Sequence, residues 1–317
     1  MEIVALAGGV GASKLLLGFS REMDPRALTV IVNTGDDLVL HGLAISPDLD
    51  IVTYTLAGAV NPKAGWGLRS DTFTALEILR RYGREHWFNL GDRDLATHIH
   101  RTALLRSGST LSEATDAIRR AWGVAARILP MSDRPVPTLI RTEIGTIHFQ
   151  EYLVKHRTEL TVEEIIFDGV EEARPAPGVL EAIASAAGIV VCPSNPLISI
   201  GPILALPGVR EALRNRRERV VAVCPIVGGK SLKGPSDKML KQLRYDVTAL
   251  GVARLYSDVV GTFIIDVQDA AQQQSIEALG IQVVVRATTM RTPADKERLA
   301  RAVLGALHQR AQAGAAS

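Results

Sequence analysis

The chain opens with an apolar strand that runs directly into a glycine-rich turn. Ile3–Ala7 precedes Gly8-Gly9-Val10-Gly11, and an apolar run after Lys14 marks a helix. Glycines let the main chain approach a ligand closely, and a helix N-terminus adds partial positive charge, so such a unit can bind phosphate. Lys14 stands where the dinucleotide fingerprint needs its last glycine, and Ser13 stands where a P-loop needs glycine. A strand–turn–helix unit that binds nothing therefore stays open as an alternative.

Short apolar runs rich in valine and isoleucine recur along the chain, and each ends in a loop of small or polar residues. Continuous apolar runs of this length are typical of parallel strands that are buried on both faces. Helical patterns lie between several of them, so we predict an α/β fold with a Rossmann-like, doubly wound and mainly parallel sheet. The expected strands are Ile3–Ala7, Leu28–Val32, Ile189–Cys192, Val220–Cys224, Phe263–Ile265 and Ile281–Val285.

A helical segment interrupts this alternation after the second strand. Its third helix begins with a capping box, because Thr110 is followed by Glu113 at the spacing that satisfies two free backbone N–H groups. We expect these helices to form a small insertion subdomain. The expected helices cover residues 71–82, 95–107 and 111–122.

The remaining chain completes the nucleotide-binding core. A hairpin is expected over 138–150, and a last helix over Pro293–Arg310, with residues 311–317 as a frayed tail. The predicted domains are therefore a core over 1–60 and 125–317 and a helical insertion over 61–124.

Composition and charge exclude several functional classes. The 317 residues are 47% hydrophobic and 22% charged with a net charge of +2, which favours neither nucleic acid nor an anionic membrane as a partner. No apolar run approaches the roughly 18 residues that span a bilayer, and no basic region precedes the first apolar stretch. Cys192 and Cys224 each end an apolar run, and we interpret them as a reduced, buried pair. We expect a cytoplasmic protein.

Acidic residues gather in the loops after the second strand. Asp36, Asp37, Asp48 and Asp50 provide four carboxylates within fifteen residues. In an open parallel sheet ligands bind beyond the carboxyl ends of the strands, and such a density of oxygen ligands suits Mg²⁺. The alternative is that Asp36, Asp37 and Asp48 are turn or capping residues. A dehydrogenase would end this strand in an acid that binds ribose, but Asn33 stands there.

Other loops at the same edge carry polar side chains. In Gly91-Asp92-Arg93-Asp94, Asp94 is a plausible helix N-cap, and Arg93 could instead clamp a phosphate or carboxylate. Two longer loops, 193–202 and 225–235, are rich in hydroxyl, amide, glycine and lysine groups that suit a nucleotide.

Aromatic and histidine residues give weaker indications. Trp66 lies between two glycines and could contact a flat substrate, whereas Trp87 and Trp122 are more typical of a core. His98 and His100 are two apart on a helix, so they face different directions and cannot chelate one metal ion.

The ordered set of loops resembles one family over nearly the whole chain, the 2-phospho-L-lactate transferases of coenzyme F-420 biosynthesis (the CofD/FbiA family). No single motif is specific, but their order is. The resemblance rests on 8–11 with Lys14, 33–37, 45–50, 66–67 with 71–73, 90–94 through 97–98, 129–133, 148–150, 193–196 with 199–202, and 234–235.

This resemblance implies transfer of a 2-phospholactyl group, or of a phosphoenolpyruvyl group in bacterial members, from a guanosine diphosphate adduct. The acceptor would be the terminal ribitol hydroxyl of the deazaflavin Fo, GMP would be released, and Mg²⁺ would be required. The family does no redox chemistry itself. A homodimer is implied, with no nucleic acid or membrane partner.

Site residues can be assigned from the loops and the resemblance together. Asp50 is the candidate to deprotonate or orient the ribitol hydroxyl, or to hold the metal. The secondary metal candidates are Asp36, Asp37 and Asp48. The candidate substrate contacts are Asn89, Arg93 and Trp66, and the candidate nucleotide contacts are Gly9, Gly11, Ser13, Lys14, Ser194, Asn195 and Ser199.

Two other functions remain as alternatives. One is a nicotinamide or flavin oxidoreductase. The other is a regulatory relative of the same fold that binds a nucleotide sugar without transfer, although such relatives tend to lack the Pro47-Asp48-Leu49-Asp50 element found here.

Overall fold

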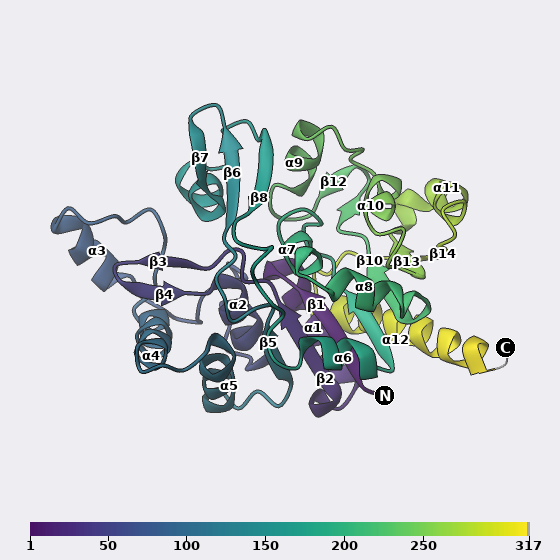
Figure 1. Cartoon of the computed structure of the whole chain (residues 1–317), viewed down its shortest axis with the longest axis horizontal. Coiled ribbons are helices and arrows are strands. Elements are labelled where there is room, and N and C mark those ends of the chain that lie inside the picture. The colour runs from purple at the N-terminus through teal and green to yellow at the C-terminus, as the bar shows by residue number, and fades with distance from the viewer. Residues whose placement is uncertain (316–317) are drawn as a thin grey trace.

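A seven-stranded parallel sheet forms the centre of the computed structural model, which describes residues 1–315, with side chains through Arg310 (Figure 1). The strand order is β14-β13-β10-β9-β1-β2-β5, and every adjacent pair is parallel. All predicted strands are present within one residue at either end, which confirms the Rossmann-like α/β class. The strands are β1 (Ile3–Ala7), β2 (Leu28–Val32), β5 (Arg127–Pro130), β9 (Gly188–Val191), β10 (Val220–Val223), β13 (Thr262–Ile265) and β14 (Gln282–Val285).

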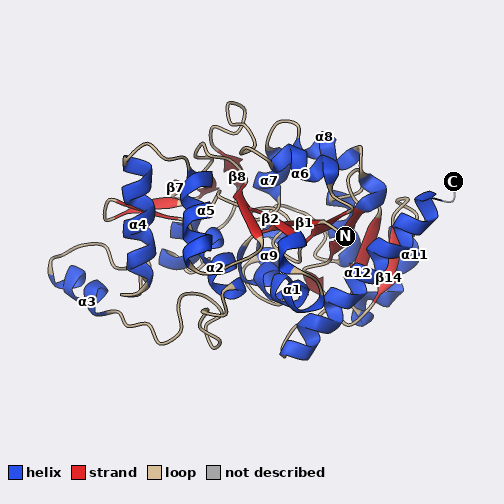
Figure 2. Ribbon diagram, turned by 90° about the horizontal axis from the view of Figure 1, so that it is seen from below, coloured by secondary structure: helices blue, strands red, loops and turns tan. Residues whose placement is uncertain are grey.

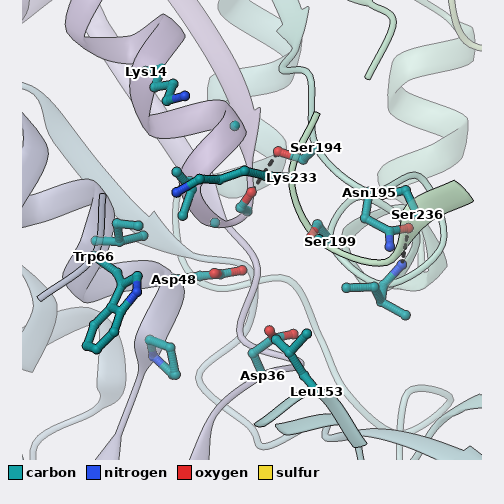
Figure 3. A pocket seen from close by; sticks show the side chains of 18 of the residues that line it. Lys14, Asp36, Asp48, Trp66, Leu153, Ser194, Asn195, Ser199, Lys233 and Ser236 are labelled. Atoms are coloured by element: carbon teal, nitrogen blue, oxygen red, sulfur yellow. Dashed lines mark hydrogen bonds between the residues drawn. The ribbon is translucent and has the colours of Figure 1, made fainter. Parts of the chain in front are cut away.

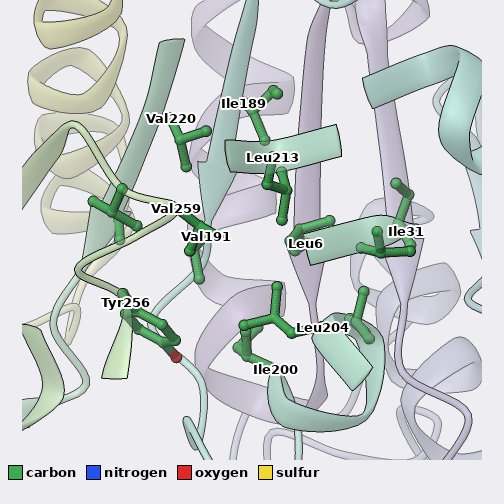
Figure 4. Close-up of a cluster of buried hydrophobic side chains, with 14 of the residues drawn as sticks. Leu6, Ile31, Ile189, Val191, Ile200, Leu204, Leu213, Val220, Tyr256 and Val259 are labelled. Carbon is green, nitrogen blue, oxygen red and sulfur yellow. The ribbon is translucent and has the colours of Figure 1, made fainter. Parts of the chain in front are cut away.

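Helices cover both faces of this sheet, as Figure 2 shows for α6–α8 on one side and α1 and α12 on the other. Side chains alternate along each strand, so Ile3 and Ala5 pack under α1 and α12 while Val4 and Leu6 face the opposite layer. Figure 4 shows that opposite layer, where Leu6 and Ile31 meet side chains of α7 and α8. The first layer comprises α1 (Gly9–Glu22), α2 (Pro47–Leu56) and α12 (Pro293–Ala315), and the second α6 (Val179–Ser185), α7 (Gly201–Ala205), α8 (Val209–Arg214), α10 (Ala249–Leu255) and α11 (Gln273–Glu277).

The predicted helices of the middle segment are present at one end of the molecule (Figure 1). The capping box is confirmed: the Thr110 side chain accepts from Glu113 N, and Glu113 accepts from Thr110 N. The third helix packs against β5 at the edge of the main sheet. The division into a core and an insertion stays a prediction. The helices are α3 (Thr74–Arg81), α4 (Asp94–Arg106) and α5 (Leu111–Ala121).

Three smaller sheets stand beside the main one. The predicted hairpin is confirmed and gains a third antiparallel strand, in the order β7-β6-β8. A second hairpin, β3–β4, was not predicted; its turn at His41 and Gly42 has positive φ at both residues, as a type I′ turn requires. The strands are β3 (Leu38–Leu40), β4 (Leu43–Ile45), β6 (Thr138–Thr142), β7 (Gly145–His148), β8 (Glu164–Phe167), β11 (Ile226–Val227) and β12 (Lys230–Ser231), and the remaining helices and short turns are η1 (Pro25–Ala27), η2 (Glu151–Lys155), η3 (Arg217–Arg219), α9 (Ser236–Gln242) and η4 (Val267–Gln272).

Two further expectations concern the chain end and the cysteines. Helix α12 continues to Ala315, so most of the expected tail is helical, and residues 316–317 lie outside the described residues. Cys192 and Cys224 are both free and buried, as predicted. Burial raises the pKa of Cys224 to about 12. None of the helices within residues 1–315 combines the length and the apolar character needed to cross a membrane.

The first and last helices pack closely because α1 carries a glycine where they meet. A Cβ added at Gly18 would lie 3.0 Å from the Cβ of Ala300 and would overlap the Lys296 carbonyl oxygen. Gly305, on an exposed face of α12, has no atom within 4 Å of such a Cβ.

These two glycines should respond to alanine in opposite directions. Gly18→Ala forces the helices apart and should lower the free energy of unfolding by about 1–3 kcal/mol. Gly305→Ala removes only the flexibility of glycine and should raise the free energy of unfolding by about 0.5–1 kcal/mol. Urea unfolding of both variants measures this difference, and equal shifts would contradict the close packing.

Candidate active site

A cavity of about 760 Å³ opens at the carboxyl ends of the parallel strands. Five strands lead into it, through Gly8–Gly11 after β1, Asp36 after β2, Pro193–Asn195 after β9, Pro225 after β10 and Thr288–Arg291 after β14. This is the edge of the sheet at which we expected a ligand to bind. Figure 3 shows acidic, basic, hydroxyl and aromatic side chains around one space.

The glycine turn packs directly on the loop after β9. A Cβ at Gly8 would lie 2.7 Å from the Ser199 Cβ, and one at Gly11 would overlap the Pro193 carbonyl oxygen. Ser194 Oγ donates to Gly8 O at 2.6 Å and fixes the two loops together. Helix α1 begins at Gly9, so its first N–H groups lie at the cavity wall, as an anion site requires.

Asn33 joins two of the predicted metal-binding carboxylates. Its Nδ2 donates to Asp36 Oδ1 at 3.0 Å and to Asp48 Oδ2 at 2.9 Å, and Gln150 Nε2 donates to Asp36 Oδ2 at 2.8 Å. Both carboxylates line the cavity. Asp37 does not line the cavity, and its Oδ2 accepts a hydrogen bond from Ser46 Oγ at 2.7 Å.

These three carboxylates form no ion pair with the side chains of residues 1–310, and Asp36 and Asp48 are buried. Burial raises the pKa of Asp36 and Asp37 well above the ordinary value, and it raises the pKa of Asp48 to about 6 against the opposing hydrogen bonds from Asn33 and Gly9 N. Among residues 1–310, no lysine, arginine or histidine nitrogen lies within 4.0 Å of any of the three. Oxygen ligands in this condition fit a divalent cation, since a bound cation would favour their ionised forms.

Asp50 lies inside α2 and forms a buried ion pair. Both Nη atoms of Arg101 donate to its carboxylate, with the Nη1–Oδ2 bond at 3.1 Å. Burial raises the pKa of Asp50, and the charges of Arg101 and His98 oppose that shift. Asp50 is not a helix cap, because α2 begins at Pro47 and Asp50 lies in its first turn.

His98 lies between Asp50 and Asp94. Its Nδ1 is 3.6 Å from Asp50 Oδ2, and its Nε2 is 3.4 Å from Asp94 Oδ2. Tyr54 donates its hydroxyl to Asp94 at 2.6 Å. His98 is buried and His100 exposed, so the two face different directions as predicted. Asp50, Asp94 and His98 each offer one ligand atom within 4.8 Å of the others, but the Arg101 pair already satisfies Asp50.

The 91–94 loop differs from expectation. Asp94 is not the N-cap but the first residue of α4, and the carboxylate of Asp71 accepts from the N–H groups of Arg93 and Asp94 at 2.8 and 3.1 Å. Arg93 is exposed, lies outside the cavity wall and donates to Arg69 O at 3.3 Å. The structure therefore does not bring Arg93 to the cavity, whereas Asn89 and Trp66 do line it.

Most of the predicted nucleotide contacts line the cavity. Lys14 is half-buried, with Nζ 3.4 Å from Met290 O, and burial followed by repulsion from Lys233 lowers its pKa. Ser13 is an exception, because it is buried outside the wall and donates to Val10 O at 2.9 Å. The other predicted contacts that line the cavity are Gly9, Gly11, Ser194, Asn195 and Ser199.

Several lining residues had been given no role from sequence. Gln150 is the last residue of the predicted hairpin, and Thr288–Arg291 follow the last predicted strand, so their place at the sheet edge could have been inferred. The place of Tyr54 and Phe88 in the cavity wall could not have been inferred, because it depends on how α2 and the 88–94 loop pack.

Comparison with known proteins places these features in a family. Residues 3–301 match the family model described as 2-phospho-L-lactate transferase CofD. A phosphoenolpyruvate transferase of Streptomyces griseus is 46% identical over 89% of this chain and 91% of its own. A 2-phospho-L-lactate transferase of Methanosarcina mazei is 41% identical over 93% and 97%. The solved protein BH3568 of Bacillus halodurans shares the fold, with a TM-score of 0.64 and 18% identity over 96% of this chain and 99% of that one.

Asp48 should make the metal-free protein lose stability as pH rises. Its pKa is about 6 in the folded chain against 3.8 ordinarily, so between these values the folded state binds more protons and the free energy of unfolding falls. Relative to Asp48→Asn, the wild type should lose about 2–3 kcal/mol between about pH 4 and pH 7. Urea unfolding with a chelator measures this loss, and parallel pH curves would exclude it.

Proposed function

Because the chain belongs to the CofD family of 2-phospho-L-lactate transferases, we propose that it transfers a 2-phospholactyl or phosphoenolpyruvyl group. The donor is a guanosine diphosphate adduct, the acceptor is the ribitol hydroxyl of the deazaflavin Fo, and GMP is released during coenzyme F-420 biosynthesis. The observation that carries the proposal is one cavity that combines the glycine turn of α1 with two buried carboxylates, Asp36 and Asp48, which form no ion pair within residues 1–310. We expect the enzyme to act as a homodimer.

An oxidoreductase is less consistent with the same cavity. A dinucleotide site needs an acid at the end of β2 for the ribose, and Asn33 stands there with its amide committed to Asp36 and Asp48. The Pro47–Asp50 element, which regulatory relatives tend to lack, contributes Asp48 and Asp50 to the cavity wall.

Magnesium is the proposed cofactor, with Asp36 and Asp48 as its protein ligands. They are the carboxylates that line the cavity and lack a cationic partner within residues 1–310. When bound, the ion would neutralise charge on the diphosphate. Asp37 lies outside the cavity wall, accepts a hydrogen bond from Ser46 and receives no role as a ligand.

The transfer is a substitution at phosphorus. The ribitol oxygen bonds to the phosphorus that carries the lactyl group, the bond from that phosphorus to the bridging oxygen breaks, and GMP leaves with the electron pair. Such chemistry needs positioning and charge neutralisation more than a covalent intermediate. Asp50 is the proposed acceptor of the hydroxyl proton, and Arg101 holds its carboxylate in place.

The remaining lining residues bind the two substrates. Lys14 and the N-terminus of α1 hold the diphosphate, and Ser194, Asn195 and Ser199 the guanosine part. Asn89 and Trp66 contact the deazaflavin. Arg93 and Ser13 lie outside the wall and receive no role.

The proposal is tested by incubating the protein with Fo, Mg²⁺ and either the lactyl or the enolpyruvyl guanosine diphosphate adduct. Mass spectrometry should detect GMP and the phosphodiester of the deazaflavin in equal amounts, with one donor preferred. Nicotinamide-dependent spectral change, or nucleotide binding with no product from either donor, would overturn it.

Asp50→Asn should suppress transfer by about 10²–10⁴, the usual effect of removing a general base. If Asp50 instead holds Mg²⁺, excess metal should partly restore the rate. The variant also leaves Arg101 without its buried ionic partner, so its melting temperature should fall. Rates are therefore measured below that temperature, with unchanged GDP affinity as the folding control. Normal turnover in a protein that melts lower would remove Asp50 from the chemistry.

Lys14→Ala should weaken GDP binding by about tenfold, because a charged hydrogen bond to the diphosphate is lost. Binding of Fo should change little, since Fo carries no phosphate. Calorimetric titration with each ligand separates the two effects. Unchanged GDP affinity would show that Lys14 does not bind the donor.

A further inference from the structure

Two loops from distant parts of the chain meet at the mouth of the cavity. Lys233 Nζ donates to Ala64 O at 3.0 Å, across 169 residues of sequence. Both loops line the cavity, one through Trp66 and the other through Leu232 and Lys233. Figure 3 shows Lys233 extended across the space, from the side of Ser194 toward that of Trp66.

Each loop is closed at its base by its own hydrogen bonds. Asn61 N donates to Gly67 O at 2.9 Å, and Ser231 Oγ donates to Gly234 O at 2.8 Å. Positive φ angles occur at Gly65, Gly67 and Gly234, where glycine allows backbone rotation that other residues resist. Each loop is therefore a closed unit, and the Lys233–Ala64 bond links the two.

Lys233 has a weak partner in this arrangement. Its ammonium contacts a neutral carbonyl, and within residues 1–310 neither it nor Lys14 has a carboxylate within 4.0 Å. The two ammonium groups repel each other across the cavity. An anionic oxygen binds an ammonium group more strongly than a carbonyl does, because both partners are then charged. A diphosphate or carboxylate that enters should take Lys233 away from Ala64.

We propose that Lys233 binds the anionic donor, and that losing its bond to Ala64 frees the 61–67 loop to close Trp66 onto the flat acceptor. This inference rests on the proposed function and adds an order to it: the donor prepares the acceptor site. Because such coupling is reciprocal, each substrate should tighten the binding of the other.

Lys230 provides a matched control. It lies in the same basic loop, carries the same charge and is exposed, but it does not line the cavity. Lys233→Met and Lys230→Met therefore remove equal charge from the same surface, and any long-range electrostatic effect on an anion should be similar in both. A difference between them reports the direct contact of Lys233.

The test uses GDP, pyrophosphate and Fo as probes, with calorimetry for affinity and tryptophan emission for loop movement. The contribution of Trp66 is isolated by comparison with Trp66→Phe, since the chain has 3 tryptophans. In the wild type, GDP should alter Trp66 emission and tighten Fo binding. Lys233→Met should bind GDP about tenfold or more weakly, and its Fo affinity should be the same with and without saturating GDP. Lys230→Met should behave as the wild type.

Equal GDP affinities for Lys233→Met and Lys230→Met would overturn the donor contact, and tightening of Fo by GDP that persists in Lys233→Met would overturn the link. Failure of the proposed function gives a different pattern. Pyrophosphate binding that depends on Lys233, without GDP binding, would count against the guanosine donor alone. A wild type that binds GDP but not Fo would count against the proposed acceptor. The GDP affinities of Lys233→Met and Lys230→Met would then still test whether Lys233 contacts the donor. No binding of either anion overturns both.

Discussion

The burial of negative charge is the constraint around which the site is built. Asp36 and Asp48 lie under the loops of a sheet edge, where no lysine, arginine or histidine nitrogen of residues 1–310 is within 4.0 Å. Hydrogen bonds from Asn33, Gln150 and Gly9 offset the effect of burial in part. One amide, that of Asn33, serves both carboxylates, and Gln150 reaches Asp36 from the small antiparallel sheet. Burying ionised carboxylates costs free energy, so this site favours a ligand that brings positive charge.

The core of the fold could be predicted because parallel strands buried on both faces leave continuous apolar runs in the sequence. Strand β5 was missed for a physical reason. It is an edge strand that starts at Arg127 and ends at Pro130, so only two apolar residues remain between them. Proline is tolerated there because no further strand needs its N–H. The strands of the β3–β4 hairpin have three residues each, too few to show a periodic pattern, so the sequence indicates this hairpin only through its turn.

The site was predictable as a set of loops but not as a set of contacts. The sheet rule brought the glycine turn, the acidic loops and the 193–202 loop to one edge, and the cavity lies there. The pairing of Asp50 with Arg101 could not be inferred, since it joins side chains of α2 and α4 that are 51 residues apart in the sequence. The failure of Arg93 to reach the cavity has a similar origin, because the Asp71 cap fixes the start of α4 and leaves Arg93 exposed.

The buried thiol at the end of β10 has a consequence for chemical probes of this enzyme. Cys224 contributes to the cavity wall, yet its pKa of about 12 leaves almost no thiolate at neutral pH, and its Sγ is 3.2 Å from the Ile226 carbonyl oxygen. Alkylating reagents and peroxide attack the thiolate. A cysteine can therefore line this cavity and remain inert, so electrophilic inhibitors aimed at the cavity would have to react with another nucleophile.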